Sequence, residues 1–177
     1  MKQIMVVGCP GSGKSTMAIR IAQKLDLPVV HLDKIHYAPV WQERTKAEKI
    51  RLAMRAEQAD RWVIDGNLSA TYPHRLSRAD CCVWLDIPLH IRLWRVLKRR
   101  LSGARVGLPR GSPDQLTWEF IKYVLRSDRL TRPKYQKLHL EAGSTPFHHL
   151  RSTQKINSFL STLSAPMLKA TVRGDRN

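Results

Sequence analysis

Near its start, the chain combines glycines with a lysine and a hydroxyl at fixed spacing. The stretch Gly8-Cys9-Pro10-Gly11-Ser12-Gly13-Lys14-Ser15-Thr16 matches G-x-x-x-x-G-K-[ST], the pattern of a phosphate-binding loop (P-loop). Glycines let backbone N–H groups turn toward phosphate oxygens, and the helix that follows directs its positive end at them. Lys14 can reach the β- and γ-phosphates, and the Ser15 hydroxyl can bind Mg²⁺. The residues expected to bind ATP here are Gly8, Pro10, Gly11, Ser12, Gly13, Lys14, Ser15 and Thr16.

The alternative is a chance glycine turn in front of a core helix. At average glycine usage of roughly 7%, the bare pattern occurs by chance in under about 1% of chains of this length. The flanking sequence favours the phosphate site further. An apolar segment, Ile4 to Val7, precedes the loop, and apolar residues recur at helical spacing after it.

Three aspartates stand where short apolar strands are expected to end: Asp33, Asp65 and Asp86. The carboxyl ends of parallel strands share one edge of a sheet, so all three point toward the P-loop edge. We expect Asp65, with Ser15, on the metal side, and Asp33 on the acceptor side or as the base that takes a hydroxyl proton. A strand-end aspartate that caps a turn or helix is the simpler alternative. For Asp86, which precedes Ile87-Pro88, we favour that capping role.

Arginines on one helix face are candidates for neutralising the transferring phosphate. Arg95 and Arg99 are four residues apart, and both are expected to act in catalysis, with Arg95 also contacting the nucleotide. The alternative is a solvated basic face. Arginines beyond the next loop could complete the clamp, namely Arg126, Arg129 and Arg132. Arg92 and Arg100 are expected on the surface.

Aromatic residues follow Asp33 closely. His36, Tyr37 and Trp41 could stack on a ring of the acceptor or could cover the core, and the sequence favours neither. Trp84 and Trp94 occur at core spacing and are expected to be buried.

Strands are expected at about 2–7, 28–32, 61–64, 80–85 and 146–150, and helices at about 14–25, 44–59, 88–101, 114–129, 131–141 and 152–163. Pro133 separates the fourth and fifth of these helices, and residues 34–42 are expected to form a loop. This alternation predicts an α/β, three-layer P-loop NTPase fold with a five-stranded parallel sheet and helices on both faces. We expect one kinase-like domain over residues 1–163, with a mobile helical lid at about 99–133 and a loose tail at 164–177.

The formal net charge of +17 is the unusual feature of the composition. Residues 87–113 contain seven lysines and arginines and no acid. Such a field attracts polyanions, either nucleotides or nucleic acid, although a basic solvated face without a partner is the alternative. No apolar run approaches the ~20 residues of a membrane span. The three cysteines form no disulfide framework, which predicts reduced thiols and a cytoplasmic protein.

The motifs together resemble known P-loop proteins. The P-loop, with Leu85-Asp86-Ile87-Pro88 and the two arginines on the next helix, is similar to adenylate-kinase-like small-molecule kinases. The combination of His31-Leu32-Asp33, residues 62–67 (WVIDGN) and residues 94–100 (WRVLKRR) resembles the DNA topology modulation protein, or FlaR-like, group. The resemblance covers roughly residues 2–160. It implies an adenylate-kinase-like fold, ATP binding and, by the group's name, an effect on DNA.

One motif departs from that resemblance. Adenylate kinases carry D-G-x-P-R, whereas this chain has Asp65-Gly66-Asn67-Leu68-Ser69 and lacks the arginine that holds the acceptor phosphate. Arg75 is a candidate to replace it.

The sequence therefore predicts a phosphotransferase that uses ATP and Mg²⁺, with Lys14, Asp33, Asp65, Arg95 and Arg99 in catalysis. A nucleic-acid-associated ATPase and a nucleotide-binding regulator with little turnover are the alternatives. The first would use the +17 charge to bind DNA. The sequence offers no helix-turn-helix, zinc module or RNA-binding aromatic signature in its support.

Overall fold

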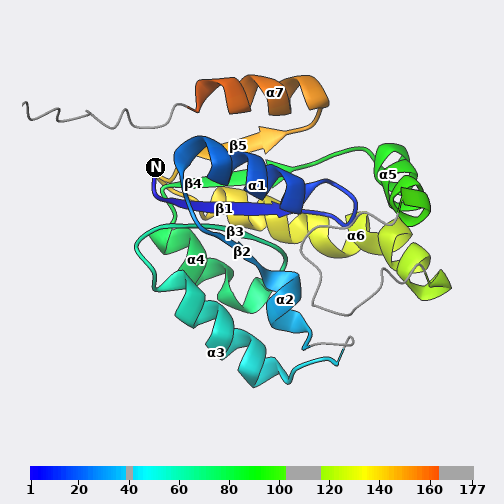
Figure 1. Ribbon diagram of the computed structural model, residues 1–177, viewed down its shortest axis with the longest axis horizontal. Coiled ribbons are helices and arrows are strands. Elements are labelled where there is room, and N and C mark those ends of the chain that lie inside the picture. The colour runs from blue at the N-terminus through cyan, green and yellow to red at the C-terminus, as the bar shows by residue number, and fades with distance from the viewer. Residues whose placement is uncertain (39–41, 103–116, 164–177) are drawn as a thin grey trace, which may run out of the picture.

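Five parallel strands form the centre of the molecule, in the order β2-β3-β1-β4-β5 (Figure 1). The computed structural model describes residues 1–38, 42–102 and 117–163. The strands are β1 (Gln3–Gly8), β2 (Val29–His31), β3 (Trp62–Asp65), β4 (Cys81–Leu85) and β5 (Phe147–Leu150). In the register of the sheet, Asp65 lies opposite Val6 on one side and His31 on the other. The five-stranded parallel sheet predicted from the sequence is confirmed.

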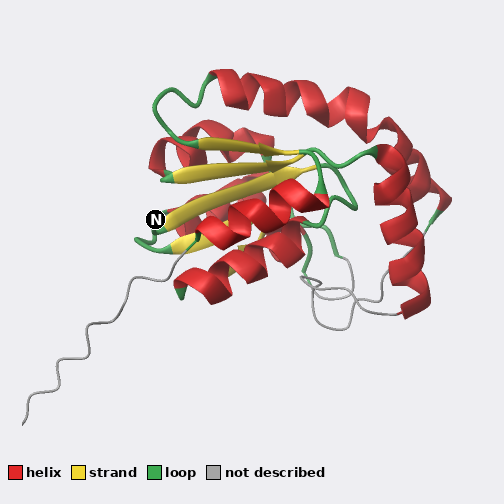
Figure 2. Ribbon diagram, turned by 90° about the horizontal axis from the view of Figure 1, so that it is seen from above, coloured by secondary structure: helices red, strands yellow, loops and turns green. Residues whose placement is uncertain are grey.

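Helices cover both faces of this sheet, as Figures 1 and 2 show. Alternate residues of β1 face opposite sides. Ile4 and Val6 pack with the helices α1 (Lys14–Leu25) and α7 (Thr153–Thr162). Met5 and Val7 pack with α3 (Lys46–Glu57), α4 (Tyr72–Arg78) and α6 (Trp118–Leu140). All four β1 residues are fully buried, so the strand that carries the P-loop is held from both faces.

Two further helices stand at the edge of the sheet that carries the P-loop. α5 (Leu89–Ser102) lies beyond the carboxyl ends of the strands in both views (Figures 1 and 2). The short α2 (Leu32–His36) follows β2 directly, where the sequence predicted a loop. A single turn of 3-10 helix, η2 (Ser69–Thr71), precedes α4.

Side-chain caps mark the starts of three helices in the described residues, and at α6 the Thr117 hydroxyl accepts from the backbone N–H of Phe120. Thr45 and Glu48 form a reciprocal capping box at the start of α3. Ser152 accepts a hydrogen bond from the backbone N–H of Lys155 and caps α7. These caps fix helices that otherwise begin in polar loops.

The predicted break at Pro133 is wrong, because α6 runs through it without interruption. Proline removes one helical hydrogen bond, here the one to the carbonyl of Arg129. Both residues are exposed, so water can satisfy that carbonyl. Val124, Ser127, Tyr135 and Leu138 are buried on the opposite side and hold both halves of α6 against the rest of the fold.

The prediction that Trp94 is buried is also wrong, since 63% of it is exposed. Among the described side chains of α5, Arg92 and Val96 are buried, and Trp94 lies about 200° around the helix from Arg92. Trp84 is buried, as predicted.

Within the predicted lid region, residues 103–116 lie outside the described part of the chain, as does the predicted tail at 164–177. The lid and the domain boundaries stay predictions. Among the described residues, no helix is long and apolar enough to cross a membrane.

Candidate active site

The P-loop connects β1 to α1 and curves beneath α5. Gly11 has a φ of 77°, and a Cβ built on it would lie 2.7 Å from the carbonyl oxygen of Arg92. Only glycine combines this left-handed backbone with such a close approach to another helix. Gly13, with a φ of 94°, stands immediately before α1, so the N-terminal amides of that helix open toward the loop.

The polar groups of the loop fit a phosphate chain. Lys14 Nζ donates a hydrogen bond to the carbonyl oxygen of Cys9 (3.2 Å), which folds the lysine back along the loop. Ser12 Oγ is buried and has no hydrogen-bond partner among the described residues. A buried hydroxyl without a partner is costly in a closed fold and is expected where a ligand completes the bonding. The cradle and its donors therefore suit the nucleotide phosphates.

Ser15, Asp65 and His31 form a hydrogen-bonded chain next to the loop. Ser15 Oγ donates to Asp65 Oδ2 (2.7 Å), and His31 Nδ1 lies 2.5 Å from Asp65 Oδ1. Asp65 is only 3% exposed. The sequence predicted Ser15 and Asp65 as a metal-side pair, and the structure brings them into contact. It did not predict His31, whose side chain reaches Asp65 from the neighbouring strand.

The donor set suits Mg²⁺ in the way common for kinases. Mg²⁺ is usually held by one or two protein oxygens, waters and substrate phosphates rather than by a full protein cage. In the described parts of the chain, no group of three or more His, Cys, Asp or Glu side chains could hold a metal ion. A metal bound by Ser15 and Asp65 would therefore depend on the nucleotide for its remaining ligands.

Asn67 supports the loop from beneath. Its Nδ2 donates to the carbonyl oxygen of Gly8 (3.0 Å), and its Oδ1 accepts from the hydroxyl of Tyr72 (3.4 Å). Burial raises the pKa of Tyr72, so this hydroxyl keeps its proton and acts as a donor. The motif Asp65-Gly66-Asn67 was recognised in the sequence, but the sequence did not show that Asn67 bonds to Gly8 and Tyr72.

Arg92 was expected on the surface, and that prediction is wrong. It is 0% exposed, and its guanidinium donates to the carbonyl oxygens of Ile87 (2.9 Å) and Pro10 (3.3 Å). It also bonds Ser127 Oγ (3.0 Å) and Asp128 on α6. Arg92 thus fastens the P-loop to two helices, and nothing in its local sequence marks it as different from its basic neighbours.

Arg95 lies at the loop, as expected for a residue that contacts the nucleotide. Its Nη1 donates to the carbonyl oxygen of Ser12 (3.0 Å). Arg99 is half-buried one turn further along α5. On α6, Arg126 and Arg129 are exposed, and Arg132 instead binds Asp86. The structure therefore places Arg95 at the P-loop and gives Arg132 another partner.

The carboxylate of Asp86 forms hydrogen bonds and ion pairs with basic side chains. Its Oδ2 accepts hydrogen bonds from Arg132 Nη2 (2.9 Å) and His149 Nε2 (2.8 Å), and Arg151 Nε lies 3.7 Å away. The expected capping role is replaced by a link between the end of β4, α6 and β5.

The sequence predicted an acceptor next to Asp33, and the residues near this side chain come from α2 and the first half of α6. Asp33 is half-buried on α2. Burial raises the pKa of Tyr123 on α6, and the nearby Cys9, Asp33 and Tyr37 raise it further. Burial also lowers the pKa of His36, whose Nε2 has no hydrogen-bond partner among the described residues. These residues gather around the side of the P-loop where an acceptor would lie. Trp41 is outside the described part of the chain.

Arg75 does not replace the missing acceptor-phosphate arginine. It is fully buried and donates to Glu57 (2.9 Å), Thr71 Oγ1 (2.6 Å) and the carbonyl oxygen of Gly66 (3.3 Å). All three of its nitrogens have partners inside the protein, so it holds α3 and α4 together.

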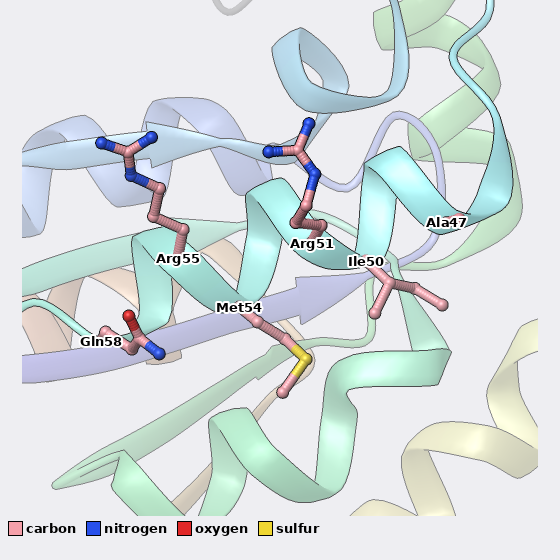
Figure 3. Close-up of a pocket in the computed structure, with 6 residues that line it drawn as sticks. All are labelled: Ala47, Ile50, Arg51, Met54, Arg55 and Gln58. Carbon is pink, nitrogen blue, oxygen red and sulfur yellow. The ribbon is translucent and has the colours of Figure 1, made fainter.

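A groove of about 710 Å³ lies on α3, away from these residues (Figure 3). Its lining residues come from this helix and its C-cap residue, Gln58: Ala47, Ile50, Arg51, Met54, Arg55 and Gln58. It contains no predicted site residue and no carboxylate or nucleophile, so it is not the site of the chemistry.

Comparison with known proteins agrees with this geometry. A family of AAA domains, AAA_18, matches residues 4–107, which include the P-loop, Asp33, Asp65 and Arg95. The chain belongs to this family. A cytidylate kinase from Pyrobaculum calidifontis is 28% identical over 114 residues. That match covers 56% of this chain and 61% of the length of the relative.

Two solved shikimate kinases share the fold. The enzyme from Acinetobacter baumannii, in complex with shikimate, has a TM-score of 0.64 and 14% identity over 92% of this chain and 90% of its own. That from Bacteroides thetaiotaomicron has a TM-score of 0.57 and 16% identity over 92% and 95%. The chain therefore has the fold of P-loop small-molecule kinases. None of these relatives supports the expected link to DNA topology.

Proposed function

We propose that the protein is a kinase that transfers the γ-phosphoryl group of ATP to a hydroxyl of a small acceptor, with Mg²⁺. The observation that carries this proposal is the 2.7 Å hydrogen bond between Ser15 and Asp65. It joins the hydroxyl of the P-loop to a buried carboxylate at the end of a strand. A hydroxyl and a carboxylate are the two protein groups that a nucleotide-bound Mg²⁺ needs.

Each residue has a defined part in the reaction. Lys14 and the loop amides would hold the phosphates, and Ser15 and Asp65 would hold the metal. Bound Mg²⁺ supplies charge neutralisation on the phosphate oxygens. Asp33 would accept the proton of the acceptor hydroxyl. The oxygen of that hydroxyl would form the new bond to the γ-phosphorus while the bond from the γ-phosphorus to the β-phosphate oxygen breaks. Arg95 and Arg99 would stabilise the charge on the transferring group.

The acceptor has to be found by experiment. ATP turnover with Mg²⁺ would be measured against nucleosides, nucleoside monophosphates and small hydroxylated metabolites, with Lys14→Ala as the inactive control. We expect one small acceptor to accelerate turnover strongly in the wild type and not in Lys14→Ala. Tight ATP binding without acceleration by any acceptor would contradict the kinase and favour the regulator with little turnover.

A second candidate, a nucleic-acid-associated ATPase, is favoured by one surface. The exposed face of α6 carries four cations within an arc of about 80° and a length of about 22 Å: Lys122, Arg126, Arg129 and Lys137. Trp118 is exposed on the same face, with Lys122 Nζ 5.6 Å from its ring centre. Backbone phosphates and unstacked bases are the partners that such a surface would bind.

A fourfold glutamine variant of this α6 face tests the second candidate. Its matched control replaces four exposed cations on α1 and α3, namely Arg20, Lys24, Arg51 and Arg55. If DNA is the partner, only the α6 variant loses salt-dependent DNA binding and DNA-stimulated ATPase activity. Equal losses in both variants would mean a general charge effect and would contradict a nucleic-acid site on α6.

A further inference from the structure

We infer that His31 is a positioning residue that orients Asp65 and thereby sets how tightly the site takes up Mg²⁺ with the nucleotide. This inference rests on the proposed kinase function, because it assigns a role within the same site. It also gives a function to the first residue of His31-Leu32-Asp33, which the proposed mechanism leaves unexplained.

The contact is specific in its geometry. His31 and Asp65 are register partners on the neighbouring parallel strands β2 and β3. Each carboxylate oxygen of Asp65 has its own partner: Oδ2 takes the Ser15 hydroxyl at 2.7 Å, and Oδ1 meets His31 Nδ1 at 2.5 Å. A carboxylate accepts hydrogen bonds, so Nδ1 carries the proton in this contact. Two fixed donors on two oxygens leave the carboxylate a single orientation.

The backbone around this contact is equally constrained. Gly66, directly after Asp65, has a φ of 122°, and a Cβ built on it would lie 2.7 Å from Leu32 Cβ. The pairs His31-Leu32 and Asp65-Gly66 therefore pack against each other residue by residue. His31 stands immediately before α2, and α2 carries Asp33. The metal side and the expected acceptor side of the site are therefore connected through His31.

Loss of the His31 donor would have a predictable cost. Asp65 is nearly fully buried, so little water reaches Oδ1 to replace the lost bond. The carboxylate could then rotate, and Ser15 would lose a fixed partner. Removal of a residue that orients a metal ligand typically lowers metal affinity by about 10–100-fold.

The test compares four variants by titration calorimetry with a non-hydrolysable ATP analogue, at a series of Mg²⁺ concentrations and in EDTA. His31→Leu removes the donor, and His31→Ala is the second such variant in case leucine prevents folding. His31→Asn keeps an N–H at about the same distance from the backbone. His149→Leu is the matched control, because it breaks the corresponding histidine–aspartate contact to Asp86 at the same sheet edge.

We expect His31→Leu to need about 10-fold more Mg²⁺ for half-maximal analogue binding, with binding in EDTA nearly unchanged. His31→Asn should recover most of this loss, and His149→Leu should behave as the wild type. The inference is overturned if His31→Leu and His31→Ala respond to Mg²⁺ as the wild type does, or if His31→Asn is as impaired as they are. If the wild type binds the analogue equally well without Mg²⁺, the result contradicts the proposed function and, with it, this inference.

Discussion

Asp65 and Asp86 stand at equivalent places in the sheet but have partners of different charge. Asp65 ends β3 and Asp86 follows β4, and these strands are the two neighbours of β1. Asp65 is held by one hydroxyl and one imidazole. Asp86 is surrounded by Arg132, Arg151 and His149.

Under the proposed function, this difference separates a metal-binding carboxylate from a structural one. A guanidinium is always protonated in proteins, so Asp86 already has its counter-ions and offers little attraction to a metal. The partners of Asp65 orient it without guanidinium charges beside it. Position at the end of a strand is therefore not enough to assign a role. Our proposal assigns the two roles from the charge of the partners.

The largest expected effect is on catalysis at Asp65. Asp65→Asn keeps one accepting oxygen for His31 and places an NH2 group against the Ser15 hydroxyl, which can rotate to accept from it, but it removes the negative charge that would hold the metal. We expect turnover to fall about 100–1,000-fold while the melting temperature changes little. Steady-state kinetics with the acceptor found in the panel measure this. An Asn variant with near-normal turnover would contradict the assigned role of Asp65.

The next effect is on stability at Asp86. Asp86→Asn leaves two arginines and a histidine close together without their anion. We expect the free energy of unfolding to fall by about 2 kcal/mol, measured by urea denaturation, with turnover within about threefold of wild type. The opposite result, a stable protein without activity, would place Asp86 in the active site and remove the contrast with Asp65.

The smallest effect concerns the neighbour of His149 on β5. His148 packs against Phe159, and burial lowers its pKa below the usual 6.5. The His148 imidazole therefore binds a proton less readily in the folded state than in the unfolded state. The contribution of neutral His148 to stability is complete above pH 6.5 and decreases as the pH falls below 6.5. We expect His148→Asn to lose less stability than the wild type between pH 7 and about pH 5. Urea titrations at both pH values test this, and equal losses would contradict it.

The sequence was a good guide to the fold because the fold depends on local patterns. Short apolar segments alternate with amphipathic ones, and the P-loop motif marks the first turn between them. The continuous α6 was missed because the sequence does not show whether water can replace the hydrogen bond that Pro133 removes. On the exposed side of α6, it can.

Sequence was a weaker guide to the arginines. Arg75 and Arg92 belong to basic stretches and look like their neighbours, yet both are buried. Their partners, Glu57 and Asp128, are 18 and 36 residues away, so no local pattern reveals them. The role of His31 was missed for the same reason, since Asp65 is 34 residues further along the chain.

The most direct test of the account measures the binding of a non-hydrolysable ATP analogue, with and without Mg²⁺, to wild type, Asp65→Asn and Asp86→Asn. The account predicts that Mg²⁺ strengthens binding to the wild type and to Asp86→Asn by similar factors, and that Asp65→Asn loses most of this gain while its metal-free binding persists. An unchanged Mg²⁺ effect in Asp65→Asn would contradict the assignment of the metal side, and with it the proposed mechanism.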